Sequence, residues 1–340
     1  MRWLTARRED DRGAVAVWVA LSIIPIVGFL AVVADVGMLY WERGQLQNGA
    51  DSAALSVAME CAQKPTTCSA GSAALASTIA SQNANDGNAN ATIADLEIDG
   101  RSGSVTVVAS TLTDDGAVEL VHPLASMVVG AEVAQTVDAR ATVEWGTPVA
   151  GNTLALAFGL CEFMEHMPSG GSVDGTPITV RYDTTERRNC GGVFARGGFG
   201  WLDSGSCQAD ISLDDPWVEG DPGASSSGSG CPSTYLRNLA VNKTTVLVPL
   251  FEDCRTGSSG SATGKCTGAN TEYQIVRFAA FKVTGIKIPG TMLPDPAAVP
   301  SCGGGCFGIQ GYFLDYVELG EDYELGDAPY GGLQIVRMID

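Results

Sequence analysis

The sequence predicts an α+β protein: an N-terminal transmembrane helix extending into an extracytoplasmic helix, then a small α/β module and a mostly β, disulfide-stapled, loop-rich domain. Three observations predict this class. A long uncharged apolar run opens the chain, short segments rich in β-branched residues recur after it, and all ten cysteines follow the run. The resulting division is a cytoplasmic tail at 1–12, a transmembrane helix at 13–41, a membrane-proximal α/β module at 42–146 and an extracytoplasmic mostly β domain at 147–340.

Charge and composition narrow the range of functions. Of the 340 residues, 45% are hydrophobic and 17% are charged, and the formal net charge is −19. The first 43 residues are neutral, so the excess of acid lies in the remainder, which repels phosphates and excludes a nucleic-acid partner. Because the chain has only two histidines, His122 and His166, and no catalytic motif, we expect no metal, no cofactor, no small-molecule substrate and no enzymatic activity.

The run from Ala14 to Ala34 predicts the membrane span. Its 21 residues carry no charge, and a helix of that length is roughly 31 Å long, close to the hydrocarbon thickness of a bilayer. A cleaved signal peptide has a shorter apolar core of roughly 7–15 residues, and a buried helix in a soluble protein is seldom apolar on all sides. A helix anchored in the lipid bilayer explains the run best.

The flanking charges predict the orientation of this span. Four arginines precede Gly13, whereas the other side has Arg43 and then no basic residue before Lys64. Basic residues favour the cytoplasmic side of a membrane. We therefore expect a single-pass protein of the cell membrane with a cytoplasmic N-terminus and an extracytoplasmic C-terminal part. Tyr40 and Trp41 fit an aromatic anchor at the outer interface.

Two residues of the span are unusual. Pro25 predicts a kink, which a membrane helix tolerates better than a soluble one. Asp35 lies near the outer end of the span, at a depth where a carboxylate must reach the headgroups or a partner. Two interpretations of Asp35 stay open: a carboxylate at the interface, or a contact to another membrane subunit.

The module at 42–146 combines helical and alternating patterns. Apolar residues from Leu46 to Ala58 recur at three- and four-residue spacing, so the helix continues beyond the membrane until Lys64-Pro65 breaks it. The further elements predicted form a βαβ-like unit behind a helix: a second helix at Ala70–Ala80, a loop at Asn83–Asn90, strands at Ser104–Thr111 and Glu132–Trp145, and a short helix at His122–Val129.

Gly146-Thr-Pro148 marks the predicted boundary of the outer domain. The apolar segment Thr153–Glu165 is compatible with a helix and with a buried strand. Two Gly/Ser-rich stretches, 222–230 and 256–264, have the composition of flexible loops. Strands are predicted at Ile178–Tyr182, Thr245–Phe251, Tyr273–Thr284, Phe307–Leu319 and Leu333–Met338.

The cysteines predict up to five disulfides outside the cell. Their number is even, and a zinc site would need paired Cys-x-x-Cys units or histidine ligands, which the sequence lacks. The connectivity does not follow from the sequence. Proximity and the flanking of loops favour Cys61 with Cys68, Cys207 with Cys231, Cys254 with Cys266 and Cys302 with Cys306, and the remaining candidates are Cys161 and Cys190.

The first sixty residues resemble a known family. The elements that carry the resemblance are Arg12-Gly13 before the span, Ala34-Asp35-Val-Gly37 at its outer end, and Leu46-Gln47 followed by Ala50-Asp51-Ser-Ala-Ala-Leu55. They are similar to the N-terminal region of TadG-like proteins of the Tad (tight adherence, or Flp) pilus machinery. Weaker matches that look like the extracytoplasmic part of actinobacterial members are Gly198–Asp203, Val246–Phe251 and Phe278–Phe281.

This resemblance implies a membrane-anchored, non-enzymatic component that anchors or scaffolds pilus assembly at the cell surface. Its implied partners are the lipid bilayer and other Tad/Flp pilus assembly proteins, with Asp35, Gln47 and Asp51 as candidates for subunit contacts. Two departures matter. Some members have an Asp-x-Ser-x-Ser metal motif, which this chain lacks. Prepilins have a glutamate five residues after the cleaved glycine, whereas the residue at that distance from Gly13 is Trp18.

Two alternatives stay open. The protein is a minor pilin or pseudopilin if it is cleaved after Gly13 and incorporated in the filament. It is an envelope enzyme or ligand-binding ectodomain if the outer domain has a deep pocket with converging polar residues, a constellation that the sequence does not reveal. A catalytic pair of Cys161 and His166 is less plausible than a disulfide and a polar helix end.

Overall fold

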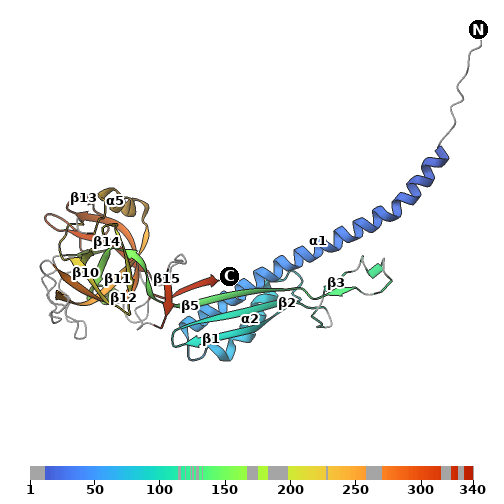
Figure 1. Cartoon of the computed structure of the whole chain (residues 1–340), viewed down its shortest axis with the longest axis horizontal. Helices are drawn as coiled ribbons and strands as arrows, with labels where there is room; N and C mark the ends of the chain where they lie inside the picture. The colour runs from blue at the N-terminus through green and yellow to red at the C-terminus, as the bar shows by residue number, and fades with distance from the viewer. Residues whose placement is uncertain are drawn as a thin grey trace, which may run out of the picture.

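The computed structural model describes residues 12–340 except 114–115, 119, 123, 125, 128–129, 132, 167–174, 183–197, 227–228, 258–269, 315–322, 328–332 and 340. The molecule is elongated (Figure 1). A long helix leads into a helix-and-sheet body, the proximal body (residues 46–111, 137–146 and 335–339), and a body of strands, the outer body (residues 154–314), lies beyond it. The predicted cytoplasmic tail, apart from Arg12, lies outside the described residues.

The first helix, α1 (Arg12–Gln63), is continuous over 52 residues. It runs through Pro25 without ending, as a helix with solvated or lipid-facing surroundings can. Beyond the apolar run, the buried side chains of Leu46, Ala50 and Val57 form the stripe that the three- and four-residue spacing predicts. The helix ends where Pro65 cannot continue it, and the Lys64 amide donates the last bond, 2.8 Å, to the Glu60 carbonyl.

The second helix, α2 (Cys68–Asn83), folds back along α1 as the alanine-rich sequence predicts. Small side chains let the two backbones approach closely, because a Cβ built at Gly49 would lie only 3.5 Å from the Cα of Ala80. The disulfide Cys61–Cys68 joins the end of α1 to the start of α2. The two helices therefore form one covalently closed hairpin.

The sheet of the proximal body consists of β1 (Ala89–Asp99), β2 (Ser102–Thr111) and β5 (Asp138–Leu154), with α1 and α2 packed against it. The expected βαβ-like unit is wrong, because β2 pairs with β5 antiparallel. The sequence also did not reveal β1. Its buried residues are the small Ala89 and Ala91, so the alternation of large apolar side chains that marks a strand is missing.

Residues 112–136 leave this sheet between β2 and β5 as an arm that reaches along α1 (Figure 1). Within it, β3 (Leu120–Val121) pairs antiparallel with β4 (Ala134–Gln135). Several residues of the short helix predicted at His122–Val129 lie outside the described residues. Among the others, the Ser126 amide donates to the His122 carbonyl at 2.9 Å, which is helical spacing.

β5 runs through the Gly146–Pro148 segment where the sequence places a domain boundary. Side chains up to Trp145 belong to the proximal core, and those from Leu154 belong to the outer core. The partners of β5 change along its length, from β2 and β16 (Ile335–Ile339) to β9 (Gln208–Ser212) and β15 (Tyr323–Gly326). One strand therefore joins the two bodies, and the last strand of the chain returns to the first body.

The outer body is mostly β. Its described elements, together with the strands that pair with the end of β5, are β6 (Leu156–Gly159), α4 (Leu160–His166), β7 (Ile178–Arg181), β8 (Phe199–Leu202), β9 (Gln208–Ser212), β10 (Trp217–Asp221), α5 (Ser233–Asn242), β11 (Thr245–Thr256), β12 (Thr271–Ile288), β13 (Thr291–Leu293), β14 (Gly308–Leu314) and β15 (Tyr323–Gly326). The α+β class and the mostly β nature of this part are as the sequence predicts.

The main sheet of the outer body curls on itself. Its strand order is β10-β8-β6-β11-β12-β14-β7, and β10 also pairs with β12. The strands β8, β6, β11, β12 and β10 thus form a closed ring, which leaves few free sheet edges. All these pairings are antiparallel except that of β6 with β11.

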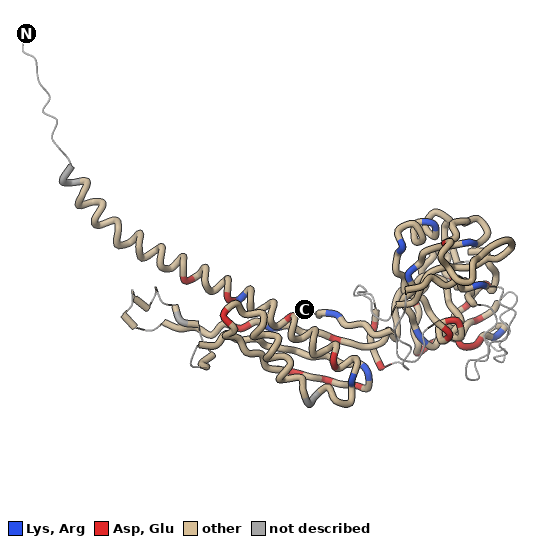
Figure 2. Tube along the Cα trace, turned by 180° about the vertical axis from the view of Figure 1, so that it is seen from behind, with Lys and Arg blue, Asp and Glu red and all other residues tan. Residues whose placement is uncertain are grey.

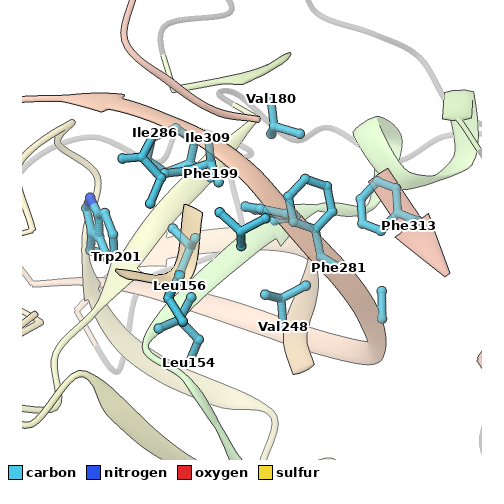
Figure 3. Packing of buried hydrophobic residues seen from close by; sticks show 14 of the residues in the cluster. Leu154, Leu156, Val180, Phe199, Trp201, Val248, Phe281, Ile286, Ile309 and Phe313 are labelled. Atoms are coloured by element: carbon cyan, nitrogen blue, oxygen red, sulfur yellow. The ribbon is translucent and has the colours of Figure 1, made fainter. Parts of the chain in front are cut away.

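Aliphatic and aromatic residues together fill one core of the outer body (Figure 3). The ring of Phe281 packs edge-on against Phe158 at 4.9 Å and against Phe313 at 5.0 Å between centroids, a favourable geometry for aromatic pairs. A second core lies on the other face of the same strands and contains Phe251 and Tyr273. The alternation of side chains along β11 and β12 supplies both cores.

The sequence found the long strands and missed the short ones. The predicted strands beginning at Ile178, Thr245 and Tyr273 are β7, β11 and β12, with β12 longer than expected. The undecided Thr153–Glu165 segment contains both structures, β6 followed by α4. Within the described residues, β14 and β16 cover the last two predicted strands. In the outer body and the strands paired with the end of β5, the described elements that sequence patterns did not predict are β8, β9, β10, β13, β15 and α5.

The described disulfides agree with sequence proximity. Three bonds are present, Cys61–Cys68, Cys207–Cys231 and Cys302–Cys306. Cys161 and Cys254 are disulfide-bonded as well. Cys190 and Cys266 lie outside the described residues, and with them the predicted pair Cys254–Cys266.

Candidate membrane-anchoring and subunit-contact site

The first half of α1 stands apart from both bodies and exposes apolar side chains on most of its circumference (Figure 1). Residues Gly13–Ala34 carry no charge, and Figure 2 shows a long tan stretch of this helix before its first acidic residue. Within the described chain, α1 is the single helix long and apolar enough to cross a membrane. Exposed apolar residues in this number are unfavourable in water, so this stretch requires a nonpolar surrounding.

Tyr40 and Trp41 mark the outer end of the apolar stretch. Both side chains are exposed, at 76% and 69%, on the part of α1 that lies beside the arm. An aromatic ring with a polar edge is favoured at the headgroup level of a bilayer. The exposure of this pair therefore agrees with the interfacial anchor that the sequence predicts.

Asp35 is buried in the structure, at 5% exposure. Ala31, Asp35 and Leu39 follow one another at four-residue spacing and so share one face of α1. On that face, Leu39 packs against the proximal core together with Leu120 of the arm. Asp35 is thus buried on the face of α1 that Leu39 shares, away from the exposed side of the helix.

Gln47 and Asp51 lie one turn apart on α1 and contact each other. The Gln47 amide Nε2 donates to Asp51 Oδ1 at 2.7 Å and lies 3.2 Å from the carbonyl oxygen of Arg140 in β5. Both side chains are half-buried. The structure brings these two candidates together at the seam between α1 and the sheet, whereas Asp35 lies three to four turns away toward the membrane.

The alanines between these polar residues have a packing role. Ala50, Ala53 and Ala54 are fully buried between α2 and the sheet. Since the backbones of α1 and α2 lie in near contact, larger side chains at these positions would separate the helices. The string from Leu46 to Leu55 therefore specifies how α1 joins the proximal body.

A groove lies between α1 and the base of the arm. Its volume is about 370 Å³, and its lining consists of Val36, Leu39, Tyr40 and Arg43 from α1 and residues 135–138 from the arm and β5. One wall is thus apolar and aromatic, and Arg43 adds a positive charge near the outer end of the apolar stretch. No sequence pattern indicates this groove, because its two sides are almost a hundred residues apart.

The outer body has a larger cleft of about 880 Å³. It lies where the end of β5 diverges from β11, and α5 closes one side. Asn152 Nδ2 donates to Asp210 Oδ1 at 2.7 Å in its wall, and the hydroxyl-bearing Tyr235 is partly exposed beside it. Such a polar cleft is what the ligand-binding alternative requires, and sequence reasoning did not find it because its residues come from five separate segments.

A Cys/His nucleophile is excluded at α4. Cys161 is disulfide-bonded and therefore has no free thiol. Among the described residues, no group of three or more His, Cys, Asp and Glu side chains is arranged to hold a metal ion.

The fold and this site define a class: a protein with one N-terminal apolar helix suited to a membrane anchor, continuous with an α+β body. Residues 13–60 match the sequence family described as Putative Flp pilus-assembly TadE/G-like. The match confirms the resemblance over this segment and supports a role related to the Flp pilus; the actinobacterial type stays a prediction. Neither the curated proteins nor the solved structures contain a match to the chain.

Proposed function

We propose that the protein is a membrane-anchored, non-enzymatic component of a Tad/Flp pilus assembly system that scaffolds pilus biogenesis at the cell surface. Its N-terminus lies in the cytoplasm, and both bodies lie outside the membrane. The observation that carries the proposal is the continuity of α1: the exposed apolar half and the buried half that organises the proximal body belong to one helix and to one matched segment.

The orientation rests on charge. Four arginines stand before Gly13, and the acidic excess stands entirely after Arg43. Basic residues next to a span stay on the cytoplasmic side. Disulfides in both bodies are also typical of proteins outside the reducing cytoplasm.

A permanent anchor is favoured over a cleaved pilin. Trp18 stands where a prepilin has its glutamate, five residues after Gly13. A pilin must also pack its helix among neighbouring subunits. Here the arm already covers one side of α1 near Asp35, which leaves less of that helix for a filament core.

The deciding experiment is mass spectrometry of the N-terminus, performed on the membrane fraction and on filaments sheared from the same cells. An intact tail ahead of Gly13, present only in membranes, is the result we expect. A terminus at Ala14 in sheared filaments would establish a pilus subunit instead. Protease added outside sealed cells should digest both bodies and spare the tail, and digestion of the tail alone would overturn the orientation.

Subunit contacts are tested in the same cells. Asp35→Ala removes a buried charge, and Met59→Ala changes an exposed α1 residue without a proposed contact. If Asp35 contacts another subunit, the first variant should reduce both filament number and recovery of pilus proteins with the tagged chain, while its level in the membrane is unchanged. Equal behaviour of the two variants would leave Asp35 without a role in assembly.

The cleft of the outer body favours a second candidate function, a ligand-binding ectodomain. Its volume of about 880 Å³ lies within the size range of small-molecule sites, and the Asn152–Asp210 pair gives it ordered polar groups. This function does not exclude the first, because the cleft lies far from α1 (Figure 1).

A further inference from the structure

Among the described residues of the arm at 112–136, Leu120 alone packs against a hydrophobic core. The arm extends from the sheet toward the apolar half of α1 and runs beside that helix (Figure 1). Its base is fixed, because the Thr111 amide donates to the Val137 carbonyl at 3.2 Å and Leu120 packs against the proximal core. The position of its tip is therefore set by the fold.

Described residues near the tip hydrogen-bond to one another. The His122 amide donates to the Val133 carbonyl at 2.8 Å, and the Gly130 amide donates to the Ser126 carbonyl at 2.9 Å. Ser126 Oγ donates to the His122 carbonyl at 2.7 Å and accepts from the Val133 amide at 2.9 Å. A segment whose backbone groups are bonded internally can enter a nonpolar phase at low cost.

The same tip exposes apolar side chains. Met127 is 80% exposed and Leu124 is 36% exposed, and Val118 at the near end of the arm is 48% exposed. The sequence from Leu120 to Ala131 contains no Asp, Glu, Lys or Arg. In a chain with a net charge of −19, an uncharged stretch with outward apolar side chains is unusual for a surface in water.

The arm reaches the level of the membrane span. At its base, residues 135–138 lie opposite Val36 and Leu39 across the groove, and the tip lies farther toward the N-terminal end of α1 (Figure 1). Ala31 is still buried, although its neighbours Val32 and Val33 are exposed. Figure 1 shows no other described segment beside this part of α1. The tip thus stands beside residues that the span places within the bilayer.

We propose that the tip of the arm inserts into the bilayer next to α1, in the leaflet that faces the two bodies, with Met127 and Leu124 among the acyl chains. The inference rests on the proposed membrane anchoring of α1. A depth of about 5–10 Å is usual for monotopic elements of this kind. The protein would then hold the membrane at two points, and the second point would prevent the bodies from rotating freely about α1.

The chemistry of the arm specifies a lipid surface and not an anionic headgroup. The sequence around the tip has Glu119 and Glu132 and no basic residue between Arg101 and Arg140. Insertion must therefore come from burial of apolar area, without the attraction that basic segments have for acidic lipids. Zwitterionic lipids should suffice, and added salt should change little.

Photo-crosslinking of the full chain in phosphatidylcholine vesicles tests the proposal. p-Benzoylphenylalanine is placed at Met127, at Trp18 within the span, or at Val241, another exposed apolar residue, which lies on α5 in the outer body. After irradiation, lipid adducts are quantified by mass spectrometry. We expect Met127 to give adducts at a level similar to Trp18 and roughly tenfold above Val241, because only the first two positions meet acyl chains.

The three positions separate the possible failures. Adducts at Trp18 with none above the Val241 level at Met127 would overturn the insertion of the arm and leave the anchor intact. Absence of adducts at Trp18 as well would overturn the membrane anchor itself. A crosslink from Met127 to a second copy of the chain would show that protein covers the tip and would also overturn the proposal.

Discussion

Tyr273 lies in a narrow slot in the outer body. Its ring is fully buried between β8 and β10. A Cβ at Gly200 would lie 2.2 Å from the phenol oxygen, and one at Gly220 would lie 2.7 Å from the ring. Two glycines from separate strands therefore form the slot for this ring, and either would clash if it were replaced by alanine.

This burial has a consequence for pH. Burial raises the pKa of the Tyr273 phenol well above its ordinary value, and the carboxylate of Asp221 raises it further. The folded protein therefore keeps the proton at a pH where the unfolded chain, with a pKa of about 10 for tyrosine, loses it. The contribution of Tyr273 to the free energy of unfolding is therefore fully present below a pH of about 10. Above it, the free energy of unfolding decreases by at most about 1.4 kcal/mol per pH unit for one such group.

Tyr273→Phe tests this dependence, because it keeps the ring and removes the ionisable group. Between pH 9 and 11, the urea midpoint of the wild-type chain in detergent micelles should decline more steeply than that of the variant. Tryptophan fluorescence follows the transition through Trp201, which is buried in the same body. Identical slopes for the two proteins would show that Tyr273 ionises at its ordinary pKa.

Sequence reasoning succeeded at residues whose partners are close in the chain. The disulfides Cys61–Cys68 and Cys302–Cys306 could be predicted because few residues separate the two cysteines of each pair. The slot around Tyr273 could not be predicted, since Gly200 and Gly220 look in the sequence like ordinary glycines of a strand and a turn. Only the pairing of β10 with both β8 and β12 brings them to the ring.

At the scale of elements, the α1–α2 hairpin depends on small side chains where the two helices contact each other. A Cβ at Gly49 would lie 3.5 Å from both the Cα and the carbonyl oxygen of Ala80. That distance is an ordinary contact, so Gly49→Ala fits. The same spacing leaves no room for the γ and δ carbons of a leucine at position 49.

We therefore expect Gly49→Ala to maintain or raise stability by up to about 1 kcal/mol, since alanine favours a helix over glycine. Gly49→Leu should destabilise the proximal body by about 1–3 kcal/mol through overpacking. Thermal unfolding followed by circular dichroism compares the two variants. A leucine variant as stable as the alanine variant would mean that α1 and α2 can separate without cost.

Periodicity predicted α1, α2, β11 and β12, whereas composition concealed β1, α5 and most of the short strands. α1, α2, β11 and β12 have sustained patterns over ten or more residues. In contrast, β9 and β10 span five residues each and include Asp, Gln and Gly. Their side chains are placed by tertiary pairing, which overrides weak local preference.

At the scale of the whole molecule, the C-terminal segment links the two bodies. Leu333 is buried in the outer core, and Val336 of β16 packs against the proximal core. β16 pairs with β5 from Ile335 opposite Gly146 to Ile339 opposite Thr142. Arg337 and Glu144 form an ion pair across these strands.

Deletion of residues 333–340 should therefore loosen β5 in the proximal sheet. Hydrogen exchange of the full chain in micelles should accelerate at residues 142–146 by roughly tenfold or more, because their partner strand is gone. Exchange in α2 should change little. Arg337→Met serves as the control, since it removes the ion pair and keeps the strand, and a pair that is still partly exposed, at 18% and 25%, contributes about 1 kcal/mol or less. Unchanged exchange after the deletion would show that β16 contributes nothing to the sheet.

The predicted boundary at Gly146–Pro148 shows that local sequence does not reveal whether a strand continues between the two bodies. Glycine and proline there favour a break, and the change of core does fall along this stretch. The backbone nevertheless continues as one strand of 17 residues, because β16 and β15, which come from the far end of the chain, pair with it on both sides of the proline.

The shared strand determines how the molecule responds to mechanical load. If the outer body is pulled away from the membrane, tension enters the proximal body along the axis of β5. Its hydrogen bonds to β2 and β16 run perpendicular to that axis, so they are loaded in shear and share the force, instead of opening one after another. β5 thus acts as a tensile link between an anchored helix and whatever the outer body holds.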